Sequence, residues 1–112
     1  MSQDAGGEMK VRLRADLRAA MKDRRAVEAK VIRALIAALD NAEAPSEHAG
    51  RPVEQHDFKA WSAEVARLLL NGARVNEILQ AEIAEREHAA VEMERLQMPD
   101  RAEALRAEIL II

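Results

Sequence analysis

Apolar residues recur every three or four positions through the first 43 residues, which is the spacing of one face of an α-helix. This pattern predicts a first helix over about 8–22 and a second helix over about 24–43. The apolar face of the first helix consists of Met9, Leu13, Leu17, Ala20 and Met21. The second helix has a wider apolar face, which consists of Val27, Val31, Ile32, Leu35, Ile36, Ala38, Leu39 and Ala42. A face of that width indicates burial against more than one neighbour.

The connection between these helices contains Asp23, which we predict to be the N-cap of the second helix. The helical pattern then breaks over 44–60, where Pro45, Gly50 and Pro52 lie among polar residues, and a loop is expected there. Residues 61–70 fit a short helix.

Asn71 and Gly72 allow two interpretations, because they can stop one helix or begin the next. We prefer Asn71 as an N-cap, because the following helix then has one continuous apolar face. That face consists of Val75, Leu79, Ile83, Ala90 and Met93 and predicts the longest helix, over about 72–97.

A turn at Pro99 precedes the last predicted helix. Asp100, with Glu103 three residues later, has the pattern of a capping box. The apolar positions of this helix are Ala102, Leu105, Ile109 and Ile112.

Each helix can bury its apolar face only against another helix, so we predict an all-α fold, a small antiparallel bundle of four to five helices. The composition agrees, because Thr and Tyr are absent and aromatic residues make up only 2% of the chain. A length of 112 residues fits one domain, predicted over 9–112, after a disordered tail over 1–8 that contains Gly6 and Gly7. No apolar run reaches the roughly 18 residues of a membrane span and the start is not a signal peptide, so a cytoplasmic protein is expected.

The charge is unevenly distributed along the chain. Residues 1–34 hold nine Lys and Arg against five Asp and Glu, whereas 35–112 hold eight against fifteen. Four cations recur at every fourth position of the first helix and are joined by one in the following turn: Lys10, Arg14, Arg18, Lys22 and Arg25. Such a band suits a phosphate backbone or an acidic protein, and a solvated helix face is the alternative.

The long helix has the opposite character, because six glutamates lie between 77 and 94. If it packs beside the first helix, the charges of the two helices neutralise each other and the case for RNA binding weakens.

Two groups of residues are candidates for a partner interface: Phe58 and Trp61, which are the only aromatic residues, and the apolar end at Ile111 and Ile112. Core packing or contact with a second copy are the alternatives.

Residues that carry chemistry are scarce. The absence of Cys removes thiolate nucleophiles and thiolate metal sites, and no glycine-rich phosphate loop is present. Glu85-x-x-His88 has the spacing of di-iron ligands, but the second such motif that a di-iron site needs is missing. We therefore predict no catalytic residue, no metal site, no cofactor and no small-molecule ligand.

Two blocks of residues in the first half carry a family resemblance. They are Arg12-Leu13-x-x-Asp16-Leu17-x-x-Ala20-Met21-Lys22 and Ile32-Arg33-x-Leu35-Ile36-Ala37-Ala38-Leu39-x-Asn41-Ala42-Glu43. The second half adds Gln80-Ala81-Glu82-Ile83-x-Glu85-Arg86 and Glu94-Arg95-Leu96-x-x-Pro99-x-Arg101-Ala102-Glu103. Together these blocks resemble the amino-terminal helical domain of the YqeY-like (GatB/YqeY domain) family, most closely its short actinobacterial members.

The resemblance implies an association with the tRNA-dependent amidotransferase, a carbon–nitrogen ligase that uses glutamine as amide donor. It implies tRNA or an amidotransferase subunit as partner. Full-length members add a tail domain, which would begin where these 112 residues end, so none of its residues can be assigned here. The expected function is that of a non-catalytic accessory or adaptor domain, and the alternative is a protein–protein interaction or homo-oligomerisation module without a nucleic-acid role.

Overall fold

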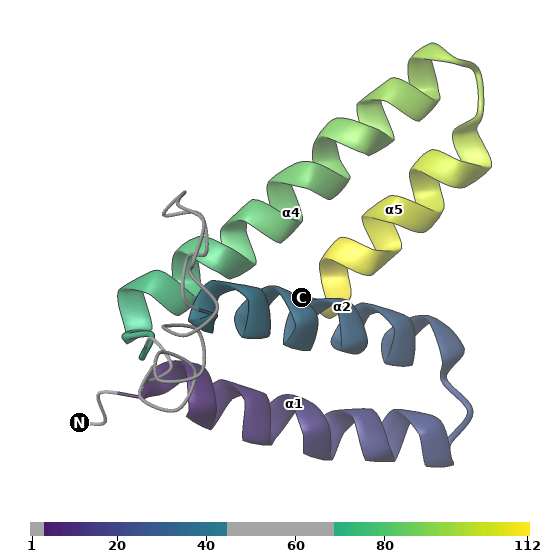
Figure 1. The fold of residues 1–112 in the computed structure, drawn as a ribbon. Coiled ribbons are helices and arrows are strands. Elements are labelled where there is room, and N and C mark those ends of the chain that lie inside the picture. The colour runs from purple at the N-terminus through teal and green to yellow at the C-terminus, as the bar shows by residue number, and fades with distance from the viewer. Residues whose placement is uncertain (1–3, 45–68) are drawn as a thin grey trace, which may run out of the picture.

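The computed structural model describes residues 4–44 and 69–112. These residues form four α-helices and no strand: α1 (Ala5–Lys22), α2 (Ala26–Glu43), α4 (Gly72–Arg95) and α5 (Pro99–Ile111). The predicted all-α class is therefore confirmed. Figure 1 shows two antiparallel helix pairs, α1 with α2 and α4 with α5. Most of the predicted loop at 44–60 and of the predicted short helix at 61–70 lies outside the described residues.

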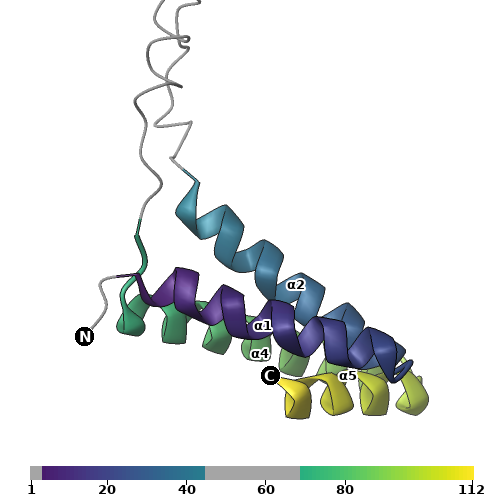
Figure 2. The ribbon, with the colours of Figure 1, turned by 90° about the horizontal axis from the view of Figure 1, so that it is seen from below.

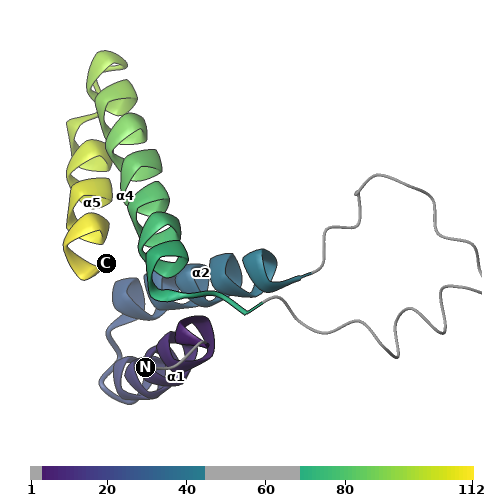
Figure 3. The ribbon, with the colours of Figure 1, turned by 90° about the vertical axis from the view of Figure 1, so that its left-hand side faces the viewer.

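The two hairpins pack across each other. Helix α2 contacts both α4 and α5, while α1 contacts α4. Figures 2 and 3 show the α4–α5 hairpin lying across one side of the α1–α2 hairpin. The side chains buried between them form one core: Leu13, Ala20, Ala29, Val31, Ile32, Leu35, Leu39, Leu70, Val75 and Ile78. The wide apolar face predicted for the second helix is explained by this double contact.

Helix α1 begins earlier than predicted. The side chain of Asp4 caps it by accepting a hydrogen bond from the Gly7 amide at 2.9 Å. Gly6 is buried, and its amide donates to the Leu70 carbonyl at 3.1 Å. Residues 5–8 are therefore the first turn of α1, and the prediction that they belong to a disordered tail is wrong. A Cβ on Gly6 would lie 2.8 Å from Glu43 Oε2 and 3.0 Å from the Leu70 side chain, so a larger residue here would have to displace these neighbours.

The turn between α1 and α2 corrects a second prediction. Asp23 is the C-cap of α1, and the N-cap of α2 is Arg25, whose side chain makes no capping hydrogen bond. The amide of Arg25 donates to the Ala20 carbonyl at 2.8 Å, and Arg24 has a left-handed backbone with φ of 60°. This is a Schellman arrangement, in which the backbone closes the end of α1 and leaves Asp23 no capping role for α2.

The α4–α5 hairpin confirms one predicted cap and corrects another. The side chain of Asn71 accepts from the Arg74 amide at 2.8 Å, as predicted for an N-cap. Asp100 does not cap α5, because the N-cap is Met98, without a side-chain hydrogen bond, and Pro99 is already the first helical residue. Proline suits that position because its missing N–H would have no helical partner there.

Two predicted core residues are exposed. Met21 is 54% exposed and Val27 is 52% exposed. Each lies at the edge of its apolar face: Met21 directly follows the buried Ala20, and a helix turns by about 100° per residue. No helix among the described residues is long and apolar enough to cross a membrane.

Candidate nucleic-acid interface

The outward side of α1 carries a row of cations. Arg14, Arg18 and Lys22 are exposed and four residues apart, so they lie one above another on the helix. The burial of Leu13 and Ala20 places these three side chains on the outward side of α1, where Arg14 also lines a small pocket with Lys10 and Glu43. Within 4–44 and 69–112, none of the three takes part in an ion pair. We call these three residues the outer basic face.

Lys10, the fourth member of the predicted band, does not belong to this face. Only 3% of Lys10 is exposed, and its Nζ donates to Asp40 Oδ1 at 2.7 Å and to Glu43. Burial alone lowers the pKa of Lys10, but the hydrogen bonds to both carboxylates outweigh that effect and raise its pKa. The prediction that Lys10 contributes to an exposed basic band is wrong, because Lys10 is buried and forms ion pairs with Asp40 and Glu43 of α2.

Arg25, the last predicted member, is exposed but already paired. Its guanidinium contacts Glu28 at 2.5 Å and Asp23 at 3.3 Å. Arg33, from α2, reaches back to the sulfur of Met21 at 3.5 Å, and with the exposed Arg24 it extends the positive charge around the α1–α2 turn. The structure therefore leaves Arg14, Arg18 and Lys22 exposed in one row, whereas Lys10 is buried against α2.

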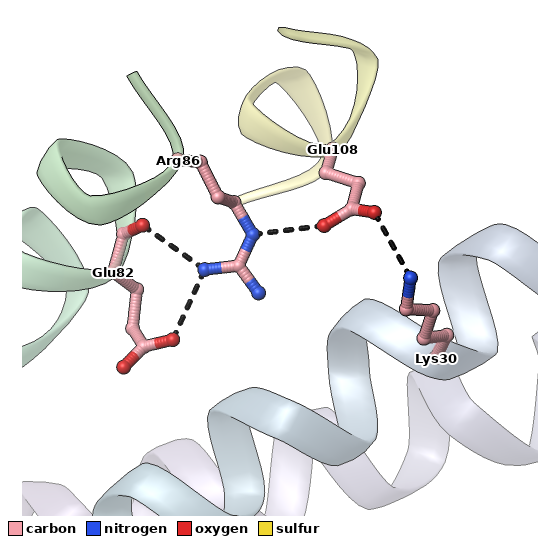
Figure 4. A network of polar contacts seen from close by, with 4 residues as sticks. All are labelled: Lys30, Glu82, Arg86 and Glu108. Carbon is pink, nitrogen blue, oxygen red and sulfur yellow. Dashed lines mark hydrogen bonds and ion pairs between the residues drawn. The ribbon is translucent and has the colours of Figure 1, made fainter. Parts of the chain in front are cut away.

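Four of the six glutamates of α4 form ion pairs within the α4–α5 hairpin. Figure 4 shows Arg86 between Glu82 of α4 and Glu108 of α5, with Lys30 of α2 on the far side of Glu108. Arg86 lies 3.0 Å from each carboxylate, and Lys30 Nζ lies 3.3 Å from Glu108. Burial would lower the pKa of Arg86, but the two carboxylates raise it.

The remaining acidic pairs also stay within the α4–α5 hairpin. Glu92 pairs with Arg95, and Glu94 pairs with Arg106 at 2.8 Å. The hydrogen bond from Arg106 lowers the pKa of Glu94. No ion pair between described residues joins α1 to α4. The outer basic face is therefore not neutralised by the acidic long helix, which was the alternative arrangement expected from the sequence.

A cleft of about 460 Å³ opens between α1 and the end of α5, and we call it the hairpin cleft. Its apolar lining consists of Met9, Leu13, Ile32, Leu35, Leu79, Ile111 and Ile112, and its polar or small rim consists of Arg12, Asp16, Ala19, Arg25 and Glu28. Ile111 and Ile112, predicted as partner residues, are half-buried in this lining. Phe58 and Trp61, the other two, lie outside the described residues.

Glu85 and His88 are both exposed on α4. In the part of the chain that the structure describes, no group of three or more potential ligands is close enough to hold a metal ion.

Comparison with models of protein families, with curated proteins and with solved structures gives no match to this chain.

Sequence reasoning missed the network around Arg86 and the hairpin cleft. The Glu82–Arg86 pair has a visible signal, since residues four apart on a helix are neighbours. The contacts of Glu108 with Arg86 and Lys30 have no such signal, because they depend on how the hairpins cross.

Proposed function

We propose that this chain is a non-catalytic accessory domain of the YqeY-like kind that contacts tRNA through the outer basic face of α1. The single observation that carries the proposal is that Arg14, Arg18 and Lys22 share one exposed side of a helix and have no acidic partner among the described residues. The sequence resemblance to the YqeY-like family supports the accessory role. The same resemblance makes an amidotransferase subunit the protein partner expected beside tRNA.

A phosphate backbone suits this face for an electrostatic reason. From Arg14 to Lys22 the face extends roughly 12 Å along the helix, enough for several phosphates to lie within reach. Cations that neutralise phosphates release condensed counterions, so affinity falls as salt rises. The face contains no aromatic side chain on which a base could stack, so recognition rests on charge and shape.

Fluorescence anisotropy with a labelled tRNA transcript tests the proposal. Three phosphate contacts predict a slope of about −2 to −3 for log affinity against log salt. Affinity is then expected to fall about 20- to 40-fold between roughly 50 and 200 mM salt. Replacement of Arg14, Arg18 and Lys22 by Glu is expected to abolish binding, with helicity by circular dichroism unchanged because all three side chains are exposed.

A charge-matched variant supplies the control. Replacement of Arg74, Arg95 and Arg101 by Glu changes the net charge equally but alters only exposed positions of α4 and α5. This control is expected to weaken tRNA binding far less. Equal loss in both variants, or no binding by the wild type at low salt, contradicts the proposal.

A further inference from the structure

The rim of the hairpin cleft has a distinctive order of side chains. Along α1 it presents Arg12, then Asp16, then Ala19, all exposed. Neither Arg12 nor Asp16 forms an ion pair with another described residue, whereas Arg25 at the opposite end of the rim is held by Glu28. The rim therefore offers a cation, an anion and a small residue in succession over seven positions, roughly 10 Å of helix.

Leu110 of α5 is the most exposed large apolar residue among those that the structure describes. Leu110 is 88% exposed, although the next two residues, Ile111 and Ile112, line the cleft. An isolated exposed leucine is ordinary on a protein surface. An exposed leucine next to residues that line an apolar cleft can instead be buried in the equivalent cleft of a second copy.

We propose that the occupant of the hairpin cleft is the α5 helix of a second copy of this chain, with Leu110 of each copy entering the cleft of the other. The rim of the cleft and the exposed side of α5 have complementary side chains. Glu103, Arg106 and Leu110 share that side, since they are three, four and seven residues apart. Their order is anion, cation and large apolar residue, over the same seven positions as the rim.

When the exposed side of α5 from one copy packs along the rim of the other copy, three contacts form. They place Glu103 against Arg12, Arg106 against Asp16 and Leu110 over Ala19. The large side chain then meets the small one, and both charge pairs have opposite signs. Arg106 already contacts Glu94 at 2.8 Å, but a guanidinium has five N–H donors and can serve a second carboxylate.

The directions of the helices suit a two-fold axis. Figure 1 shows that α5 runs back across the direction of α1. A two-fold axis perpendicular to both helices reverses α5, so that the α5 of the second copy crosses α1 in the same general direction instead of opposing it. Such an axis makes the contact isologous, which closes the assembly at two copies.

The test measures the mass of the whole chain by light scattering and sedimentation equilibrium, from low micromolar to near millimolar concentrations. A concentration-dependent dimer is expected. Replacement of Leu110 by Glu is expected to weaken it roughly thirtyfold or more, as for an interface hot spot. Leu96→Glu is the matched control, because Leu96 is 59% exposed at the far turn of the α4–α5 hairpin and lies outside the proposed contact.

A charge exchange identifies the partner helix. Arg12→Glu places like charges together and is expected to weaken the dimer at least about tenfold. Adding Glu103→Arg in the same chain reverses both charges and is expected to restore the dimer. A monomer at every concentration, a dimer that Leu110→Glu leaves intact, or failure of the double exchange to restore association overturns the inference.

Discussion

Arg86 is the side chain whose removal is expected to loosen the packing of α5 against α4. It lies between Glu82 and Glu108, and its side chain is only 14% exposed while that of Glu108 is 11% exposed. Glu108 in turn contacts Lys30, which supplies the ion pair between α2 and α5. Replacement of Arg86 by Met keeps a long side chain and helix propensity but leaves Glu108 without its closest cation.

The expected cost follows from burial. Breaking a fully buried ion pair costs about 3–5 kcal/mol, because one charge stays buried without compensation. Glu108 retains some contact with water and with Lys30, which is itself 74% exposed, so about 2–3 kcal/mol is expected for Arg86→Met. For a domain of about 100 residues this lowers Tm by roughly 10–20 °C.

Arg95→Met on the same helix is the matched control. Arg95 pairs with Glu92 at 3.0 Å but its side chain is 71% exposed, so a loss below about 1 kcal/mol is expected. Urea unfolding followed by circular dichroism measures both variants. The double variant Arg86→Met with Glu108→Met is expected to recover most of the loss, since an apolar pair replaces a broken ionic one. If Arg86→Met costs no more than Arg95→Met, the buried pair of Arg86 and Glu108 does not hold α5 against α4, and the expectation is refuted.

Three further outcomes are expected. Leu39 is 0% exposed, so Leu39→Ala should cost about 2–5 kcal/mol in urea unfolding, and a loss below 1 kcal/mol would contradict its place in the core. Gln97 has φ of 61°, so Gln97→Gly should raise the free energy of unfolding by about 0.5–1 kcal/mol, which a lower Tm would contradict. Arg106 lowers the pKa of Glu94, so this pair stabilises the fold above the usual glutamate pKa of about 4.3, and the stabilisation is lost as pH falls through the lower folded value. Carboxyl NMR titration of Arg106→Gln should show the pKa of Glu94 rising, and an unchanged value would exclude the contact.

Helical periodicity was sufficient for the all-α class and for much of the core. Leu13, Val31 and Leu35 are buried as their spacing predicts, because one face of each helix must be covered by another helix. The N-cap at Asn71 was also predictable, since Asn is strongly preferred at helix N-caps and a regular apolar pattern follows it.

The turns were predicted poorly, because backbone geometry replaced the expected side-chain caps. Arg24 and Gln97 both adopt the left-handed backbone that closes the preceding helix, although neither is glycine. Once the main chain supplies those hydrogen bonds, Asp23 and Asp100 have no capping role. A sequence without glycine at these positions gives little indication of such a turn.

Three members of the predicted basic band, Arg14, Arg18 and Lys22, are exposed on one side of α1, whereas Lys10 is buried. Regular spacing places Lys10 in line with Arg14, but α2 brings Asp40 and Glu43 to that end of α1. Local periodicity contains no information on which end of a helix meets an acidic neighbour. The hairpin cleft could not be predicted from local periodicity either, because residues from all four described helices line it.

The contact with tRNA through α1 is the central claim, and NMR of the ¹⁵N-labelled chain during titration with tRNA tests it most directly. The account predicts that the guanidinium signals of Arg14 and Arg18 and the backbone amides of α1 shift first, while the amides near Arg95 and Arg101 stay unchanged. Shifts confined to α4 and α5, or none at low salt with tRNA in excess, would contradict it.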